Sequence, residues 1–189
     1  IASTYATAIF KDRLYIGTNQ GLFTKELDKI RSHINIKYDL VEGMEGQVWN
    51  LTVRDGELLC GHHNGAYSVE GLQSKKLTNT RGVWNFMEIP GNDNLLISGT
   101  YHGFITFEKG KNGRWQFRSK VAGFDVSSKD IIIKDDYSLW MSHGYLGLFN
   151  IHLNNNIDSV ISVEGYNGTG NLPPELPDFL HEWGADFFI

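Results

Sequence analysis

Side chains that could bind a polar ligand recur in four short turns, each of which ends at a glycine. The closing glycines are Gly21, Gly65, Gly103 and Gly147, and histidine, asparagine, glutamine or tyrosine stands within two positions before each of them. Amide and imidazole groups hydrogen-bond to hydroxyls, and aromatic rings stack on sugar rings, so these residue types suit a polar ligand. The candidate ligand-binding residues in the turns are Asn19, Gln20, His63, Asn64, Tyr101, His102, His143 and Tyr145.

The same turns also have a purely structural interpretation. Glycine adopts the positive φ angles that tight chain reversals require, and the polar residues between the glycines could simply face water. The residue types alone do not separate this interpretation from a ligand-binding face, so both stay open.

Two tryptophans and an arginine extend the set of candidates. Trp49 and Trp84 stand in identical Val-Trp-Asn tripeptides, and each could form a stacking surface or wedge between twisted sheets as part of the core. Arg81 comes just before the second tripeptide and could hold a carboxylate or phosphate through two hydrogen bonds. A solvated or structural arginine is the alternative.

No arrangement of residues indicates catalysis, a metal site or a cofactor. His62, His63, His102 and His143 are spread over separate turns, whereas a metal requires ligands that converge. The carboxylates that could pair for glycoside hydrolysis fall in different loops. We therefore expect no catalytic residue, no metal and no cofactor, and a lyase or hydrolase is the weakest alternative.

Composition excludes several classes of partner. The 189-residue chain carries a net charge of −5, and its densest basic cluster is the pair Lys75-Lys76, so we expect no contact with nucleic acid. Cys60 is the single cysteine and cannot form an internal disulfide. It stands in an apolar segment, so we expect a buried, unreactive thiol. No apolar run approaches the roughly 18 residues that a membrane span needs.

The glycine-bounded turns belong to a repeat that spans the chain. Their closing glycines are 44, 38 and 44 residues apart, and apolar strand-like segments flank each turn. A period near 40 residues with several strands per unit is typical of a β-propeller. The predicted fold is all-β, a propeller of four-stranded antiparallel blades, here an arc of about four blades with the first hairpin of a fifth. The predicted blades of this single partial propeller, residues 1–189, are 5–43, 47–80, 82–122 and 127–166, and the next begins at 178–189.

Local signals refine the strands and their connections. Asp55-Gly56 predicts a tight type I′ hairpin. We place an outer strand at residues 34–38 and prefer an irregular connection to a helix over residues 26–34, while residues 82–89 should open the third blade as a strand. In a four-stranded antiparallel blade the connections alternate between two faces. The glycine-bounded turns should therefore share one face with the links between blades at residues 41–47, 77–82, 122–129 and 165–177.

The repeat resembles a known family. Residues 139–149, LWMSHGYLGLF, resemble the two-component regulator propeller repeat, and residues 95–107 and 14–23 are close variants. With the paired Val-Trp-Asn tripeptides, they look like the bacterial sensors in which a propeller precedes a triple-tyrosine β-sandwich domain. Ser142-His143 departs slightly from the Gly-Thr that is usual in the repeat, and His62-His63 departs from it more.

The resemblance implies an extracytoplasmic sensor. In that family the propeller is the periplasmic part of a membrane-anchored hybrid two-component or one-component regulator, joined through a membrane helix to a histidine kinase or a helix-turn-helix module. Expected partners are a small polar ligand such as a glycan fragment, the rest of the propeller, a downstream β-sandwich domain and a second copy in a homodimer. The alternative function is a non-catalytic scaffold for protein interaction or dimerisation.

Overall fold

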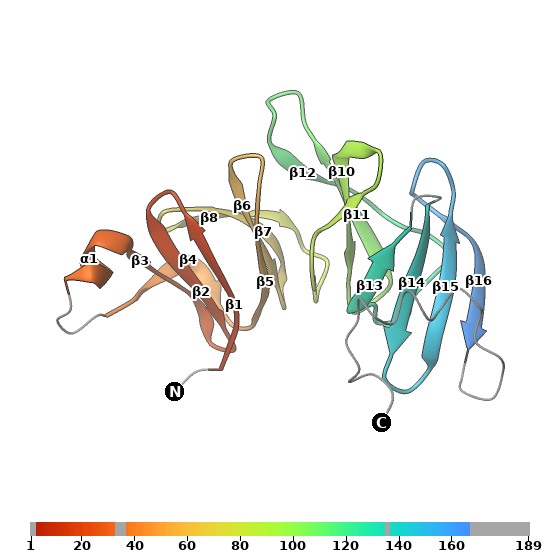
Figure 1. Ribbon diagram of the computed structural model, residues 1–189, viewed down its shortest axis with the longest axis horizontal. Helices are drawn as coiled ribbons and strands as arrows, with labels where there is room; N and C mark the ends of the chain where they lie inside the picture. Colours follow the sequence, from red (N-terminus) through yellow and green to blue (C-terminus); the bar gives the residue numbers. More distant parts are fainter. Residues whose placement is uncertain (1–2, 33–36, 135–136, 167–189) are drawn as a thin grey trace.

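Within the described residues, four antiparallel sheets of four strands follow one another along the chain (Figure 1). The computed structural model describes residues 3–32, 37–134 and 137–166. In every sheet the strands pair in the order in which they occur in the sequence. The first sheet contains β1 (Thr4–Phe10), β2 (Arg13–Thr18), β3 (Gly21–Glu26) and β4 (Asp39–Glu45), and the second contains β5 (Val48–Arg54), β6 (Glu57–His62), β7 (Gly65–Glu70) and β8 (Gln73–Thr78).

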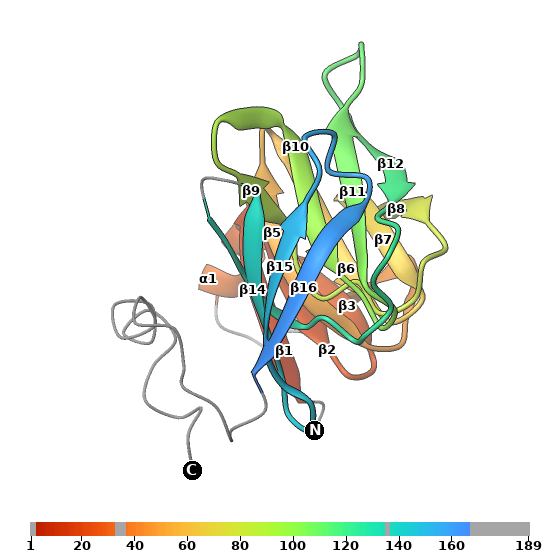
Figure 2. The ribbon, with the colours of Figure 1, turned by 90° about the vertical axis from the view of Figure 1, so that its right-hand side faces the viewer.

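The third and fourth sheets repeat this arrangement. Figure 2 shows the fourth sheet in front, with the other sheets behind it. The meander within each sheet and the side-by-side placement of the sheets form the blades of a β-propeller, as the repeat predicts. The third sheet contains β9 (Met87–Ile89), β10 (Asn92–Gly99), β11 (Phe104–Lys109) and β12 (Trp115–Lys120), and the fourth contains β13 (Asp130–Ile133), β14 (Ser138–His143), β15 (Gly147–Leu153) and β16 (Val160–Tyr166).

The apolar core lies between neighbouring blades, because alternate residues of a strand face opposite sides of its sheet. In β6, Leu58 and Cys60 pack against the first blade, whereas Leu59 between them packs with the third. Each fully buried leucine of this kind stabilises the fold by about 2 kcal/mol. Cys60 is fully buried, as predicted, and burial raises the pKa of its thiol.

Two predictions about the first blade were wrong. Residues 27–31 form the short helix α1 (Leu27–Arg31), whose backbone begins with a hydrogen bond from Leu27 N–H to Asp12 O at 2.9 Å. The outer strand is β4, and residues 37–38 of the predicted strand at 34–38 are not in a strand, while residues 34–36 lie outside the described residues. Part of the predicted link at 41–47 is therefore strand. The reason is burial, because Val41 and Met44 are fully buried against the second blade.

The opening of the third blade also differs from the prediction. Only Met87–Ile89 of residues 82–89 form a strand. Side chains take the place of ladder hydrogen bonds just before it: Asn85 Oδ1 accepts from Gly99 N–H at 3.2 Å, and Ser98 Oγ donates to Asn85 O. The segment therefore stays beside β10 without regular pairing, because local side-chain bonds compete with the strand ladder.

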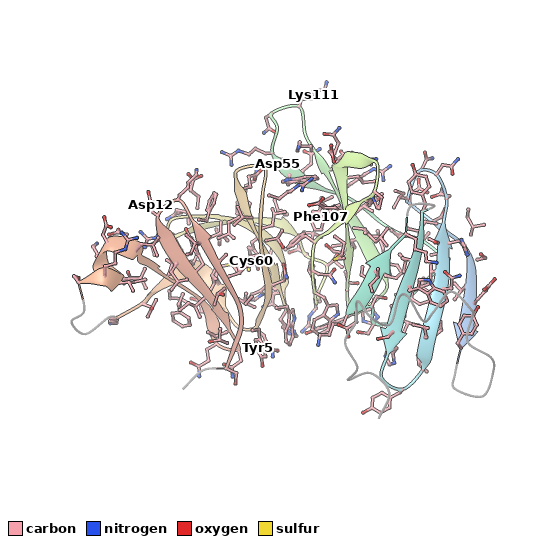
Figure 3. All side chains as sticks on the ribbon, viewed as in Figure 1. Tyr5, Asp12, Asp55, Cys60, Phe107 and Lys111 are labelled. Atoms are coloured by element: carbon pink, nitrogen blue, oxygen red, sulfur yellow. The ribbon has the colours of Figure 1, made fainter. Side chains whose placement is uncertain are left out.

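In the first three blades the glycine-bounded turns and the links between blades share one face, as predicted. Gly46 N–H donates to Gln20 O at 3.0 Å, Gly82 N–H donates to His63 O at 2.9 Å, and Gly103 N–H donates to Val126 O at 2.9 Å, so each of these turns contacts the link that follows its blade. We call this surface the glycine-turn face. Figure 3 shows Tyr5 at this end of the sheets and Asp12, Asp55 and Lys111 at the opposite end. The predicted link at 165–177 lies almost entirely outside the described residues.

The opposite face carries the tight hairpins. Asp55 and Gly56 have φ angles of 49° and 74°, which confirms the type I′ turn predicted from their sequence. The predicted hairpin of a fifth blade, residues 178–189, lies outside the described residues.

Candidate functional site

A row of four aromatic rings crosses the first three blades on the glycine-turn face. The ring centroids of Tyr5 and Trp49 are 5.4 Å apart, those of Trp49 and Trp84 are 4.5 Å apart, and those of Trp84 and Tyr101 are 5.1 Å apart. We call Tyr5, Trp49, Trp84 and Tyr101 the aromatic row. Tyr5 is exposed and the other three are half-buried, so the row is neither closed core nor free surface.

Bulges in the first strands aim two of these rings. The pairing of β1 with β2 skips Tyr5, between the pairs Thr4–Thr18 and Ala6–Gly17. The pairing of β5 with β6 skips Trp49 in the same way. An extra residue in one strand turns its side chain away from the regular alternation, so both rings leave the blade interior and point along the glycine-turn face.

Arg81, His63 and Tyr101 form a chain of hydrogen bonds beside the row. Arg81 Nη2 lies 2.6 Å from His63 Nε2, and His63 Nδ1 lies 2.9 Å from the Tyr101 hydroxyl oxygen. A guanidinium only donates, so Nε2 accepts and the proton of the neutral imidazole is assigned to Nδ1, which donates to the tyrosine. Burial raises the pKa of the Tyr101 hydroxyl, so it keeps its own proton to donate.

A second cation reaches the row from the start of the fourth blade. Lys129 Nζ lies 5.9 Å from the centroid of the Trp84 ring, within the range of a cation–π interaction. Asn85 Nδ2 donates to the Lys129 carbonyl at 3.0 Å and fixes the backbone there. Lys129 therefore carries a positive charge over Trp84, and Arg81 carries one next to His63 and Tyr101, the latter being the neighbour of Trp84 in the row.

The first residue of each turn has a structural role. The Thr100 hydroxyl accepts a hydrogen bond from the backbone N–H of the residue two positions later, at 3.1 Å. His62 Nδ1 accepts in the same way from Asn64 N–H at 2.9 Å, and His143 Nδ1 accepts from Tyr145 N–H at 3.2 Å. The histidines of the two departing repeats therefore replace threonine as acceptors that close the turn.

His62 is also deeply buried. Its side chain packs edge-on against Tyr67, with ring centroids 5.5 Å apart, and only 1% of the residue is exposed. Desolvation, helped by the neighbouring His63, lowers the pKa of His62 to about 4. The ring is therefore neutral at physiological pH.

The structure brings together some predicted residues and separates others. Trp49, Trp84, Tyr101, His63 and Arg81 form one connected group. The other predicted candidates lie apart from this group. His102 Nδ1 lies 3.8 Å from Asp125 Oδ2, Asn19 Oδ1 accepts a hydrogen bond from Ser3 N–H, and the Gln20 carbonyl accepts one from Gly46 N–H. Asn64 is exposed beside His63, and Tyr145 is 96% exposed near His143.

Sequence reasoning missed Tyr5 and Lys129. Tyr5 precedes Gly17 by 12 residues, and Trp49 precedes Gly61 by the same number, so their equivalence was present in the spacing. Lys129 had no comparable signal, because its approach to Trp84 depends on how the fourth blade is placed beside the third.

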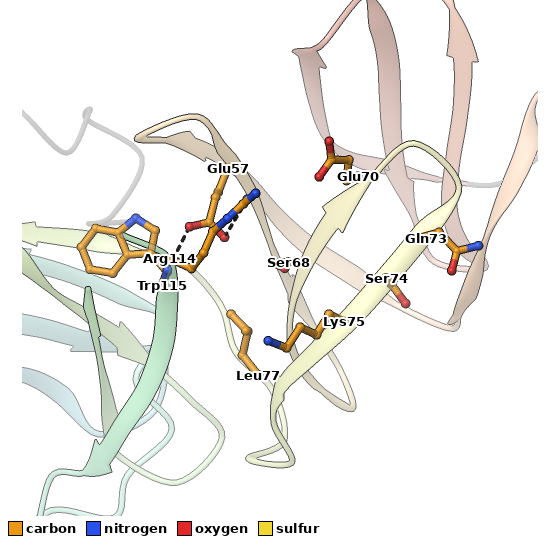
Figure 4. Close-up of a pocket in the computed structure, with 9 residues that line it drawn as sticks. All are labelled: Glu57, Ser68, Glu70, Gln73, Ser74, Lys75, Leu77, Arg114 and Trp115. Carbon is orange, nitrogen blue, oxygen red and sulfur yellow. Dashed lines mark hydrogen bonds and ion pairs between the residues drawn. The ribbon is translucent and has the colours of Figure 1, made fainter. Parts of the chain in front are cut away.

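A separate groove of about 380 Å³ lies between the second and third blades (Figure 4). The buried Glu57 carboxylate in it accepts a hydrogen bond from Trp115 N–H at 2.9 Å and lies 3.7 Å from Arg114 Nη1. None of the predicted site residues lines the groove, so we keep the candidate site at the aromatic row. The lining residues are Glu57, Ser68, Glu70, Gln73, Ser74, Lys75, Leu77, Arg114 and Trp115.

The described part of the chain contains neither a metal-binding cluster nor a membrane-spanning helix. No group of three or more histidine, cysteine, aspartate or glutamate residues there could hold a metal ion. No helix in residues 3–32, 37–134 or 137–166 is long and apolar enough to cross a membrane.

The fold and the face on which the turns meet define a β-propeller, and solved structures share this fold. Comparison with known protein families and with curated proteins gives no match. Two crystal structures of the extracellular domain of BT4673 from B. thetaiotaomicron match with a TM-score of 0.57 each, at 14% and 13% identity over 92% and 89% of this chain. One is described as part of a one component system and the other as part of a hybrid two component system.

A designed protein shares the fold too. The computationally designed Ika8 protein matches with a TM-score of 0.51 and 14% identity over 88% of this chain. The chain spans 23% of the BT4673 structures and 50% of the Ika8 structure. The likeness to BT4673 agrees with the resemblance seen in the repeats, and at these identities it shows the propeller fold.

Proposed function

We propose that this chain is part of the extracytoplasmic sensor of a bacterial signal-transduction regulator, and that it recognises a small polar ligand, such as a glycan fragment, at the aromatic row. The observation that carries the proposal is the connected group of Trp49, Trp84, Tyr101, His63 and Arg81 on the glycine-turn face. The extracellular location of the BT4673 domains supports the location and the sensor role.

The group has the two components that sugar recognition needs. Half-buried rings offer apolar faces to a sugar ring, and Arg81 and Tyr101 offer donors to its oxygens. These residues come from different blades and are held by hydrogen bonds between turns, so the surface is arranged before a ligand arrives. An arranged surface loses less conformational entropy on binding.

Thermal unfolding with a panel of oligosaccharides tests the proposal. A ligand that binds only the folded state raises the melting temperature, and a rise should occur in the wild type and disappear in Trp84→Leu. Tyr145→Ala is the matched control, because Tyr145 is 96% exposed on the turn of another blade. Loss of the rise in Tyr145→Ala with its retention in Trp84→Leu would contradict the placement of the site.

A second candidate function, a dimerisation scaffold, is favoured by the first blade. Its face away from the second blade carries the cross-strand pairs Ile9–Leu14 and Ile16–Phe23, and Ile9 is 64% exposed. Leu14 and Ile16 match Leu58 and Cys60, the positions through which the second blade packs on the first. We propose as this alternative that a second copy of the chain covers the face.

Light scattering distinguishes the scaffold from a monomeric sensor. The scaffold requires a dimer in the wild type and a monomer in Ile16→Asp, because a carboxylate would be buried in the interface. Ile161→Asp is the control, since Ile161 is 69% exposed on the fourth blade and is far along the chain from this face. A monomeric wild type removes this alternative and leaves ligand recognition untouched.

A further inference from the structure

We infer that the ligand of the aromatic row is an acidic saccharide, whose carboxylate or sulfate group lies between Arg81 and Lys129. The inference rests on the proposed function, in which the row binds a saccharide. It adds the chemical class of that ligand, and it is carried by the charges beside the rings.

Arg81 has hydrogen-bond donors that its bond to His63 does not use. The side chain is exposed, and the hydrogen bond from Nη2 to His63 uses one of the five N–H groups of the guanidinium. This bond fixes the direction in which the guanidinium points, and the remaining donors can form the paired hydrogen bonds that carboxylates and sulfates accept.

His63 holds the position of Arg81 relative to Tyr101. Its ring accepts from Arg81 on one nitrogen and donates to the Tyr101 oxygen from the other, so it joins the second blade to the third. The Tyr101 oxygen receives that hydrogen bond and still carries its own proton. The chain of bonds therefore presents a guanidinium and a hydroxyl donor beside the aromatic row.

Lys129 adds a positive charge over the Trp84 ring, at 5.9 Å from its centroid. Among the described residues, no carboxylate lies within 4 Å of the charged nitrogens of Arg81 or Lys129. Two cations without acidic partners beside an apolar ring create a site that favours a negative charge.

At another lysine–tryptophan contact, an acidic side chain of the protein is present. Lys109 Nζ lies 5.4 Å from the centroid of the Trp115 ring, and Asp55 Oδ2 neutralises it at 2.9 Å. That pair lies toward the hairpin face and needs no external anion. At Trp84, by contrast, the ligand would supply the acidic group that Asp55 supplies to Lys109.

Quenching of tryptophan fluorescence measures the binding of two matched series of probes. The acidic probes are galacturonic acid trimers and a sulfated galactose disaccharide, and the neutral probes are galactose trimers and the same galactose disaccharide without sulfate. The two acidic probes separate carboxylate from sulfate recognition. We expect at least one acidic probe to bind at least tenfold more tightly than its neutral counterpart.

Variants and salt identify the source of the preference. Arg81→Gln and Lys129→Gln should each weaken acidic binding about tenfold. Lys129→Gln should leave neutral binding unchanged, because Lys129 is outside the group proposed to bind sugar hydroxyls, whereas Arg81→Gln should also weaken neutral binding, by a smaller factor. Lys111→Gln is the control, because Lys111 is an exposed lysine at the opposite end of the sheets (Figure 3). An increase in salt from 50 to 300 mM should weaken acidic binding alone, because salt screens exposed charges.

The possible results separate the two proposals. Neutral probes that bind as tightly as acidic ones, with no effect of Lys129→Gln on acidic binding, would overturn the acidic class and leave the saccharide sensor standing. If no probe of either series binds, the saccharide function fails and the acidic class fails with it.

Discussion

His63 Nδ1 lies 2.9 Å from the hydroxyl oxygen of Tyr101, and this hydrogen bond joins the glycine-bounded turns of two neighbouring blades. The turns are 38 residues apart in the sequence. The bond fixes the edge of the aromatic row and, through the other nitrogen of His63, the direction of Arg81.

Tyr101→Phe should remove this bond and keep the ring. We expect a loss of about 1 kcal/mol in the free energy of unfolding, because the half-buried imidazole N–H loses its acceptor. Urea denaturation measures the loss, and Tyr145→Phe is the control because its hydroxyl is on an exposed residue. An equal effect of the two substitutions would show that the bond contributes no stability.

Trp84→Ala should destabilise the fold as well as abolish binding. Trp84 contacts Trp49, Tyr101 and Lys129, and its removal leaves a gap between blades that costs about 3 kcal/mol. Trp84→Phe should recover most of that loss. If Trp84→Ala unfolds at the wild-type urea concentration, the row has no packing role and serves the ligand alone.

Acid should destabilise the protein through His62. Its pKa in the folded state is about 4, below the ~6.5 of an unfolded histidine, so the unfolded state takes up the proton more readily. Stability is therefore complete above about pH 6.5 and falls as the pH drops toward 4, by roughly 3 kcal/mol in all.

His62→Thr tests this pH dependence directly. Threonine is the residue at the equivalent positions 18 and 100, where its hydroxyl accepts the same turn hydrogen bond. The variant should fold and lose most of the pH dependence between 6.5 and 4. The carboxylates with lowered pKa, Asp55 beside Lys109 and Asp125 beside Lys120, lose their stabilising contribution only at lower pH. An unchanged pH profile in His62→Thr would exclude His62 as the cause.

Gly99→Ala should be severely destabilising. A Cβ atom at Gly99 would lie 1.5 Å from the carbonyl oxygen of Ser128, so the link into the fourth blade would have to move, at a cost of about 3 kcal/mol or more. Gly144→Ala is the matched control, because nothing lies within 4 Å of its Cβ position and its φ is negative. Melting temperatures that drop equally for both variants would contradict this account.

Local sequence patterns predicted much of the fold because they act over short distances. The Asp55-Gly56 hairpin and the alternation of Leu58, Leu59 and Cys60 follow from backbone preference and from burial on both faces of a strand. The errors arose where distant contacts decide. β4 lies at Asp39–Glu45 because Val41 and Met44 are buried against another blade, and the start of the third blade is irregular because Asn85 and Ser98 replace ladder bonds.

The sequence by itself determined the propeller repeat, the face that its turns share, and five of the residues in the candidate site. Only the tertiary structure decided which of the candidate ligand-binding residues contact one another. It joined His63 and Arg81 to Tyr101, added Tyr5 and Lys129 to the tryptophans, and assigned His62 and His143 to closing their turns. The physical reason is that a repeat specifies each blade through local hydrogen bonds and burial. Side-chain contacts between blades depend instead on bulges and on how the sheets are placed side by side.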